Sequence, residues 1–212
     1  MEHPGSLRGL ELIRCSNKAE LRCARKFRNE IFRARTGIEF EPLQERRRDE
    51  SSHVMLLLQH GTPRATARVQ PYPGSGVLAE MAPRLPSFDV DSEVGRIAAL
   101  RSADSARYSL VLLVLGAIWL LQHTQHRSYV AYCHPKLLPL YQLVGARDTG
   151  LTLKKPGRPD RYCVLLGDYT ACVEGGLSQL ARAGLGEQDA VASVRGQYGT
   201  SWDDPRATES VS

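Results

Sequence analysis

The chain has 212 residues, of which 42% are hydrophobic and 24% charged, as is ordinary for a soluble globular protein. This length favours one domain, or a domain with a tail, and it provides for a sizeable core. The 28 basic and 23 acidic residues give a formal net charge of +5, which suits a phosphorylated cofactor, an acidic carrier protein or nucleic acid. Nucleic acid is the weakest of these partners, because no motif for binding RNA or DNA accompanies the charge.

The cysteines and the apolar runs exclude further classes of protein. The five cysteines are odd in number and contain no C-x-x-C pair, so neither a disulfide framework nor a metal site is expected. Residues 1–10 have no apolar core of the kind found in signal peptides. The one long apolar run, residues 110–121, is well short of the roughly 20 residues that a bilayer needs. We therefore expect a buried helix, no membrane partner and a cytoplasmic protein.

The first fifty residues predict a strand, a helix and a loop. A short strand is expected over residues 10–13. Asn17 in the cap position, with Glu20 three residues later, predicts the start of a helix, and Gly37 predicts its end. An apolar stripe with helical spacing runs between them, and arginines and lysines on the other side are expected to face solvent. Residues 41–52 are polar and highly charged, which indicates a loop.

A hairpin and a long loop come next. Residues 53–59 and 64–70 flank the turn-rich tetrapeptide His60-Gly61-Thr62-Pro63, which indicates two antiparallel strands. Residues 71–91 are rich in Pro and Gly, so we expect an ordered loop over one end of the sheet.

The centre of the sequence has a strand–helix–strand–helix pattern. Strands are expected at residues 93–100 and 127–133, separated by a polar turn and a very apolar helix at residues 108–125. This pattern predicts two neighbouring parallel strands joined by a helical crossover. Residues 150–153 and 161–167 then form a second hairpin, followed by one short helix around residues 177–183 and a mobile polar tail.

The segment Leu140-Tyr141-Gln142-Leu143-Val144-Gly145-Ala146 resembles the C-terminal motif of the Gcn5-related N-acetyltransferase (GNAT) superfamily. The Glu93-x-x-Arg96 strand and the strand end before Pro135 resemble one branch, the LuxI-type autoinducer synthases and the long-chain N-acyl amino acid synthases. The order of elements over residues 10–168 is also that of the GNAT fold. The resemblance implies an α/β (α+β) fold with a central twisted mixed sheet, flanked by helices, whose two central parallel strands splay apart. Residues 1–174 are then the GNAT-like domain, and residues 175–212 are a short helix with a mobile tail.

The resemblance also implies an activity. An N-acyltransferase of this kind moves an acyl group from a phosphopantetheine thioester, on an acyl or peptidyl carrier protein or on coenzyme A, to a small amine acceptor. No cofactor is then bound permanently. Two alternatives stay open: an acyl-homoserine-lactone synthase, and a catalytically inactive binding module of the same fold.

Three residues match catalytic positions of the superfamily. Tyr141 matches the tyrosine that protonates the departing thiolate, although a tyrosine that only packs under the sheet would look the same. Glu93 matches a residue that can relay a proton from the amine through water. His134, at the strand end, is either a base or substrate contact or merely a turn residue. We expect these three to border one cleft together with Arg96 and Arg68.

The resemblance further implies two sets of binding residues. Acceptor binding is expected from Arg96, Arg68, Arg25, Asp49, Glu50 and His53, although the sequence around Asp49 lacks the usual D-x-x-D pattern, and Arg68, Glu93 and Arg96 can equally be a stabilising ion-pair network. Donor binding is expected from Leu100, Arg101, Ser102, Arg107 and Tyr132.

Two departures from the family pattern refine these expectations. Asp104 stands where the pyrophosphate loop normally has a glycine. A carboxylate there either repels a pyrophosphate or is a plain N-cap, and both interpretations disfavour tight binding of coenzyme A. A carrier-protein donor is therefore favoured over coenzyme A. Ile38 stands where the autoinducer synthases tend to place a tryptophan, which weakens the case for S-adenosylmethionine as acceptor.

Overall fold

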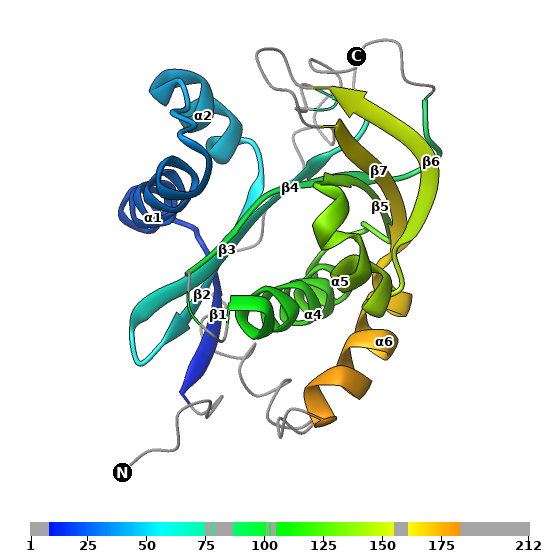
Figure 1. Cartoon of the computed structure of the whole chain (residues 1–212). Coiled ribbons are helices and arrows are strands. Elements are labelled where there is room, and N and C mark those ends of the chain that lie inside the picture. Colours follow the sequence, from blue (N-terminus) through cyan, green and yellow to red (C-terminus); the bar gives the residue numbers. More distant parts are fainter. Residues whose placement is uncertain are drawn as a thin grey trace, which may run out of the picture.

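The computed structural model describes residues 9–74, 78, 87–100, 102, 105–154 and 161–182. A seven-stranded mixed sheet, in the order β1-β2-β3-β4-β5-β7-β6, forms the middle layer. Helices α1 and α2 cover one face, and α4, α5 and α6 cover the other (Figure 1). This is the fold class that the resemblance implied.

The bounds of the strands and helices agree in most places with those expected. The strands are β1 Leu10–Arg14, β2 His53–Gln59, β3 Thr62–Pro71, β4 Ser92–Ala99, β5 Ser128–Cys133, β6 Arg147–Lys154 and β7 Arg161–Asp168. The described helices are α1 Lys18–Thr36, α2 Pro42–Glu50, α4 Ser105–His123, α5 Leu138–Leu143 and α6 Tyr169–Arg182, and a 3₁₀ turn is formed by Pro135–Leu137.

Helix α1 begins and ends where the sequence predicts. The Asn17 carboxamide oxygen accepts hydrogen bonds from the backbone N–H groups of Ala19 and Glu20, both at 3.0 Å. Gly37 closes the helix with φ of 62°, a left-handed conformation that glycine adopts without strain. The helix nevertheless buries Arg28 completely, which the expected solvent-facing side of arginines did not foresee.

The expected loop at residues 41–52 is wrong, because most of it is helix α2. Pro42 occupies the first turn, where its missing N–H costs nothing, and the Glu41 carboxylate caps the free N–H groups of Leu43 and Gln44. The buried face of this helix carries Glu45 and Asp49 in place of apolar side chains. The sequence of α2 therefore lacks the apolar periodicity that usually predicts a packed helix, and ion pairs with other elements hold this helix against the protein.

Strands β4 and β5 are adjacent and parallel, as predicted, and they pair over only three positions. Ser92, Glu93 and Val94 of β4 lie opposite Tyr129, Val130 and Ala131 of β5. Both strands continue beyond this short pairing, so they part toward the ends nearest Leu100 and His134. A β-bulge accompanies the parting, because Arg96 and Ile97 of β4 together oppose only Ala67 of β3.

Helix α4 is the core helix of the protein. Its segment Ala106–His123 is long and apolar enough to cross a membrane by length and composition, but 61% of it is buried inside the structure. It packs on the sheet together with α5 and α6 in the largest hydrophobic cluster. Helix α4 thus passes the length and composition test for a membrane span although it forms part of the hydrophobic core.

The C-terminal part departs from expectation in one respect. Helix α6 begins at Tyr169 and is much longer than the short helix expected around residues 177–183. The proposed division between residues 174 and 175 therefore falls inside α6. The expected tail at residues 183–212, the turn at residues 155–160, and Arg101 and Asp104 lie outside the described residues.

Candidate functional site

Glu45 is the centre of a buried group of charges between α2 and the sheet. Its Oε1 accepts hydrogen bonds from Arg96 at 2.9 Å (Nη2) and 3.2 Å (Nε), and its Oε2 accepts one from Arg68 Nη1 at 3.1 Å. Arg28 Nη2 forms an ion pair with Oε2 at 3.3 Å, and Arg48 Nη1 lies 3.5 Å from Oε1. Burial acts to raise the pKa of Glu45, but Arg96, Arg68 and Arg28 outweigh it and lower the pKa to about 2.

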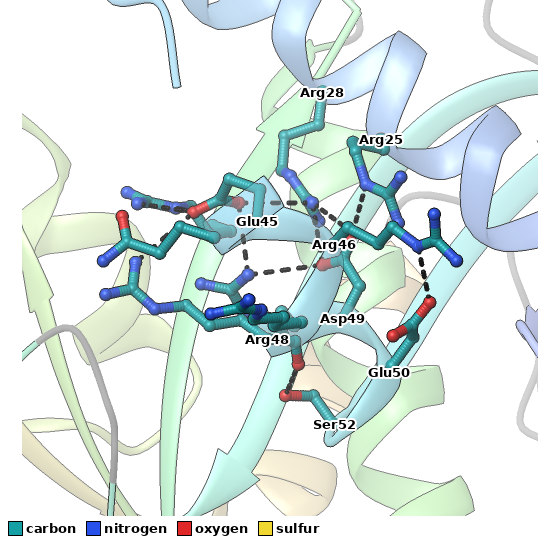
Figure 2. Close-up of polar contacts among 12 residues, drawn as sticks. Arg25, Arg28, Glu45, Arg46, Arg48, Asp49, Glu50 and Ser52 are labelled. Atoms are coloured by element: carbon teal, nitrogen blue, oxygen red, sulfur yellow. Dashed lines mark hydrogen bonds and ion pairs between the residues drawn. The ribbon is translucent and has the colours of Figure 1, made fainter. Parts of the chain in front are cut away.

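Asp49, one helical turn further along α2, completes this group. Both of its oxygens accept from Arg28 Nη2 at 2.8 Å, and Arg25 Nε and Arg68 Nη1 donate to it at 3.0 and 3.2 Å. Figure 2 shows these side chains converging from α1, α2 and the sheet. We call Arg25, Arg28, Glu45, Arg48, Asp49, Arg68 and Arg96 the arginine cluster.

Local structure explains how residues from four elements meet here. Glu45 and Asp49 are four residues apart on α2, and Arg25 and Arg28 are three apart on α1, so each pair lies on one helix face. Arg96 has φ of 55°, which is uncommon for a residue with a side chain and marks stored strain at the bulge. Its guanidinium lies 4.1 Å from the centroid of the Phe40 ring, a cation–π contact that helps to hold it.

Glu93 lies on the same face of the sheet as the arginine cluster. Gln70 is paired with Glu93 and Arg68 with Gly95, so the side chains of Gln70, Arg68 and Glu93 share the face that α1 and α2 cover. The Glu93 carboxylate is 1% exposed and accepts from the backbone N–H of Leu78 at 3.1 and 3.2 Å. The structure thus brings five predicted acceptor-side or catalytic residues together: Arg25, Asp49, Arg68, Glu93 and Arg96.

Tyr141 lies on the other face of the sheet, within the core formed by α4 and α5. Burial raises the pKa of its phenol, and Cys133 and Tyr132 add to the effect. Tyr141 and Glu93 thus lie on opposite faces of the sheet, so the structure does not bring them to one side as the expectation of a single shared cleft required. Tyr132 packs against the cluster that contains Leu78 and Val130. Its pKa is raised to about 12 by burial, while the charges of Arg96 and Glu93 also act on it.

His134 serves as a helix cap. Its Nδ1 accepts a hydrogen bond from the backbone N–H of Lys136 at 3.2 Å at the start of the 3₁₀ turn. Its ring lies 6.3 Å from that of Tyr162, centroid to centroid. These contacts correspond to the turn role that the sequence left open for it.

Two expected acceptor residues are not brought to the cluster. Glu50 lies on the exposed side of α2 and pairs with Arg46 at 2.8 Å (Figure 2), and this hydrogen bond lowers its pKa. His53 lies on the opposite face of the sheet, with its ring centroid 5.2 Å from that of Trp119 and 5.8 Å from that of His126. The resemblance implied both residues, but Glu50 lies on the exposed side of α2, and His53, the first residue of β2, faces the opposite side of the sheet.

Basic side chains from three segments lie near the end of β4 and the start of α4, where the donor was expected. The Leu100 backbone N–H donates to the carbonyl of Arg64 at 2.8 Å, and Arg64 lies 5.8 Å over the ring of Tyr108. Arg35, at the end of α1, donates to the Ala99 carbonyl at 2.9 Å, where β4 ends. Of the expected donor residues, Ser102 is exposed and Arg107 is half-buried in the first turn of α4.

Sequence reasoning missed Glu45, Arg28 and Arg48 in the cluster and Arg35 and Arg64 near the end of β4. The spacings Arg25-x-x-Arg28 and Glu45-x-x-x-Asp49 are a usable signal for two helix faces that meet. Arg35 and Arg64 carry no such signal, because only the fold brings them together. Among the described residues, no group of three or more His, Cys, Asp or Glu side chains could hold a metal ion.

Comparison with known proteins supports the fold. No protein-family model and no curated protein matches the sequence. BjaI, a CoA-dependent acyl-homoserine lactone synthase solved with MTA, superposes with a TM-score of 0.62 at 17% identity over 86% of this chain and 96% of BjaI. FeeM, an N-acyl amino acid synthase from uncultured soil microbes, gives a TM-score of 0.59 at 16% identity over 82% of this chain and 97% of FeeM.

The AHL synthase LasI gives a TM-score of 0.58 at 17% identity over 76% of this chain and 89% of LasI. The chain therefore has the GNAT fold, and its structural neighbours include both autoinducer synthases and an N-acyl amino acid synthase, the branch expected from the sequence.

Proposed function

We propose that this protein is an N-acyltransferase that moves an acyl group from a phosphopantetheine thioester to the amine of a small acceptor. The observation that carries the proposal is the parting of β4 and β5, with the arginine cluster and Glu93 on one face of the sheet and Tyr141 on the other. The neighbours of the same fold include acyl-homoserine lactone synthases and an N-acyl amino acid synthase, which supports it.

The reaction needs a base on the acceptor side and an acid on the donor side. The acceptor nitrogen attacks the thioester carbonyl and loses a proton, which Glu93 receives through water, and the C–S bond breaks as the thiolate leaves. Tyr141 protonates the thiolate. Burial raises the pKa of this phenol, which keeps it protonated until the thiolate forms.

The donor is proposed to be a carrier protein. The carriers that present phosphopantetheine are acidic, and Arg35, Arg64 and Arg107 place positive charge around the end of β4 and the start of α4. Coenzyme A is the competing donor, since BjaI is described as CoA-dependent.

An acyl-homoserine-lactone synthase remains the second candidate. It is favoured by the fold of BjaI and LasI. Ile38 argues against this candidate, because the autoinducer synthases tend to have a tryptophan at that position.

Thiol release from acyl thioesters tests the proposal. The full chain is incubated with acyl-pantetheine thioesters and a panel of amines, and products are identified by mass spectrometry. We expect amide formation that Glu93→Gln and Tyr141→Phe each slow by about 100-fold, in the range of lost general acid–base catalysis. Absence of amide with every donor and amine tried, with carrier proteins included as donors, would reduce the protein to a binding module.

A further inference from the structure

Tyr132 and Gly95 lie at the point where the parallel strands β4 and β5 part. Pairing of the two strands ends with Val94 opposite Ala131, and Gly95 and Tyr132 come next in this register. Side chains alternate between the two faces of a strand, so Tyr132 and Ala131 lie on opposite faces. The hydrophobic clusters agree, because Ala131 belongs to the core formed with α4, whereas Tyr132 packs against the cluster of Leu78.

Glu93 lies on the same face of the sheet as Tyr132, and two observations place it there. Val94 belongs to the core formed with α4, so the neighbouring Glu93 side chain points to the other face. The Glu93 carboxylate also accepts from the backbone N–H of Leu78, a member of the cluster against which Tyr132 packs. The carboxylate that is proposed to receive the proton of the amine therefore shares its face with the phenol of Tyr132, whereas Tyr141 lies on the opposite face.

The same face of the sheet is open above Gly95. Among the described residues, and apart from its chain neighbours, a Cβ atom on Gly95 would meet only Oε1 of Glu93, at 3.9 Å. A glycine inside a strand often marks a site where a ligand approaches closely. The missing side chain thus leaves room for a planar thioester group beside the Glu93 carboxylate, across the parting strands from Tyr132.

We infer that the space over Gly95 holds the thioester carbonyl group, and that the Tyr132 hydroxyl donates a hydrogen bond to the carbonyl oxygen. This inference rests on the proposed function and adds a catalytic group to that reaction. As the amine nitrogen bonds to the carbonyl carbon, the π electrons of the C=O bond move to the oxygen, and the hydrogen bond strengthens. These electrons return when the C–S bond breaks, so the proton stays on Tyr132 throughout.

The surroundings of Tyr132 suit a donor to a developing negative charge. Burial raises the pKa of Tyr132 to about 12, so the phenol is protonated at neutral pH and can donate. The charge of Arg96 acts in the opposite direction, because a guanidinium group favours negative charge nearby, and it favours an oxyanion beside the phenol for the same reason. The Tyr162 ring packs edge-on against that of Tyr132, with centroids 6.1 Å apart, which helps to fix its orientation.

Steady-state kinetics with an acyl-pantetheine thioester test this role. Tyr132→Phe keeps the ring and removes only the hydroxyl, so we expect kcat to fall by about 100-fold with KM nearly unchanged. The matched control is Tyr72→Phe, which should leave kcat unchanged. Tyr72 packs against the same cluster, but its backbone N–H donates to the carbonyl of Asp91, at the end of β4 away from the parting.

A second variant tests the placement of the thioester. Gly95→Ala adds a methyl group at an ordinary contact distance from Glu93, so the protein should stay folded while KM for the thioester rises at least tenfold. Gly116→Ala in α4, where a Cβ atom also has room, is the matched control and should leave KM unchanged. Circular dichroism shows whether each variant is folded.

Infrared difference spectroscopy gives a measurement that needs no turnover. The thioester carries a ¹³C-labelled carbonyl group and is bound to the full chain without an amine. A hydrogen bond to the carbonyl oxygen lowers its stretching frequency. The band should therefore lie at a lower frequency in the wild-type protein and in Tyr72→Phe than in Tyr132→Phe.

The outcomes separate this inference from the proposed function. Amide formation with wild-type kcat in Tyr132→Phe, or with a raised KM alone, would overturn the catalytic role and leave the acyltransferase standing. Wild-type kinetics of Gly95→Ala would overturn the placement even if Tyr132→Phe failed to fold. A carbonyl band that depends on Tyr132, without amide from any amine, would support the thioester site and remove the proposed reaction.

Discussion

Two buried clusters of polar side chains lie on opposite faces of the same sheet, and they differ in whether burial leaves their groups charged or neutral. The arginine cluster between α1, α2 and the sheet keeps its groups ionised through ion pairs of 2.8–3.5 Å. The histidine cluster, formed by His53, Trp119, His123 and His126, stacks rings at centroid distances of 5.2–5.8 Å. Burial, with Arg14 and His126 adding to it, lowers the pKa of His53 to about 4, so this ring is neutral at pH 7.

The difference shows what buried charge requires. Glu45 is as buried as His53, but it is surrounded by guanidinium groups, and its pKa falls because its charged form is favoured. His53 has positive neighbours, and its pKa falls because its charged form is disfavoured. The pKa is lowered for both Glu45 and His53, but the physical causes are opposite. One cluster is an electrostatic site, and the other is part of the core packing.

Removal of the Asp49 carboxylate from the arginine cluster should have the largest effect on the free energy of unfolding. Asp49→Ala leaves Arg28 and Arg25 without their closest carboxylate, and removal of one partner from a buried ion pair costs about 3–5 kcal/mol. Urea denaturation followed by circular dichroism measures this loss. The matched control is Glu50→Gln on the exposed side of α2, which should change the free energy of unfolding by about 0.5 kcal/mol or less. Equal losses would mean that the buried pairs do not hold α2.

The histidine cluster and the arginine cluster should lose their contributions to folding stability in different pH ranges. The unfolded histidine has a pKa of about 6.5, so between pH 6.5 and about 4 the unfolded chain binds more protons than the native one. Stability attributable to His53 therefore falls as the pH drops through this range, by up to about 3 kcal/mol. Glu45 has a folded pKa of about 2, so its contribution is present above pH 4.5 and is lost only between pH 4.5 and 2.

Denaturant titrations at closely spaced pH values separate these ranges. His53→Gln should flatten the slope between pH 6.5 and 4 and leave the more acidic range unchanged. Glu45→Gln should do the reverse. A His53→Gln protein with an unaltered slope would show that other histidines govern the loss of stability in that range.

Tyr141, which lies on the same face of the sheet as the histidine cluster, should affect turnover more than substrate binding. Tyr141→Phe removes a proton donor that acts only as the thiolate leaves, so kcat should fall by roughly 100-fold with little change in KM. Steady-state kinetics with a pantetheine thioester measures the split. A rise in KM at constant kcat would place Tyr141 in substrate packing alone.

The half-buried arginines Arg64 and Arg107, near the start of α4, should show the smallest effect on transfer, and one sensitive to salt. Arg64→Glu or Arg107→Glu should slow transfer from a carrier-bound thioester several-fold, and high salt should imitate the substitution, because charges in contact with solvent are screened. Transfer from a short pantetheine thioester should be unaffected. Arg22→Glu, on the exposed side of α1, is the matched control. Efficient use of coenzyme A thioester with harmless substitutions would assign the donor to coenzyme A.

The sequence by itself determined most of the fold. Asn17 and Gly37 mark the ends of α1, the apolar run marks α4, and the strand–helix–strand pattern gives the parallel pair β4 and β5, because caps and periodicity are local properties. It also pointed to Arg25, Asp49, Arg68, Glu93 and Arg96 through resemblance.

Only the tertiary structure decided which charged residues are buried. Residues 41–52 look like a solvated loop, because charges normally seek water, and the helix becomes favourable only when arginines from α1, β3 and β4 surround Glu45 and Asp49. Glu50 and His53 adjoin Asp49 in sequence, yet they face solvent and the opposite side of the sheet. Local sequence does not encode these outcomes, because they depend on partners far along the chain.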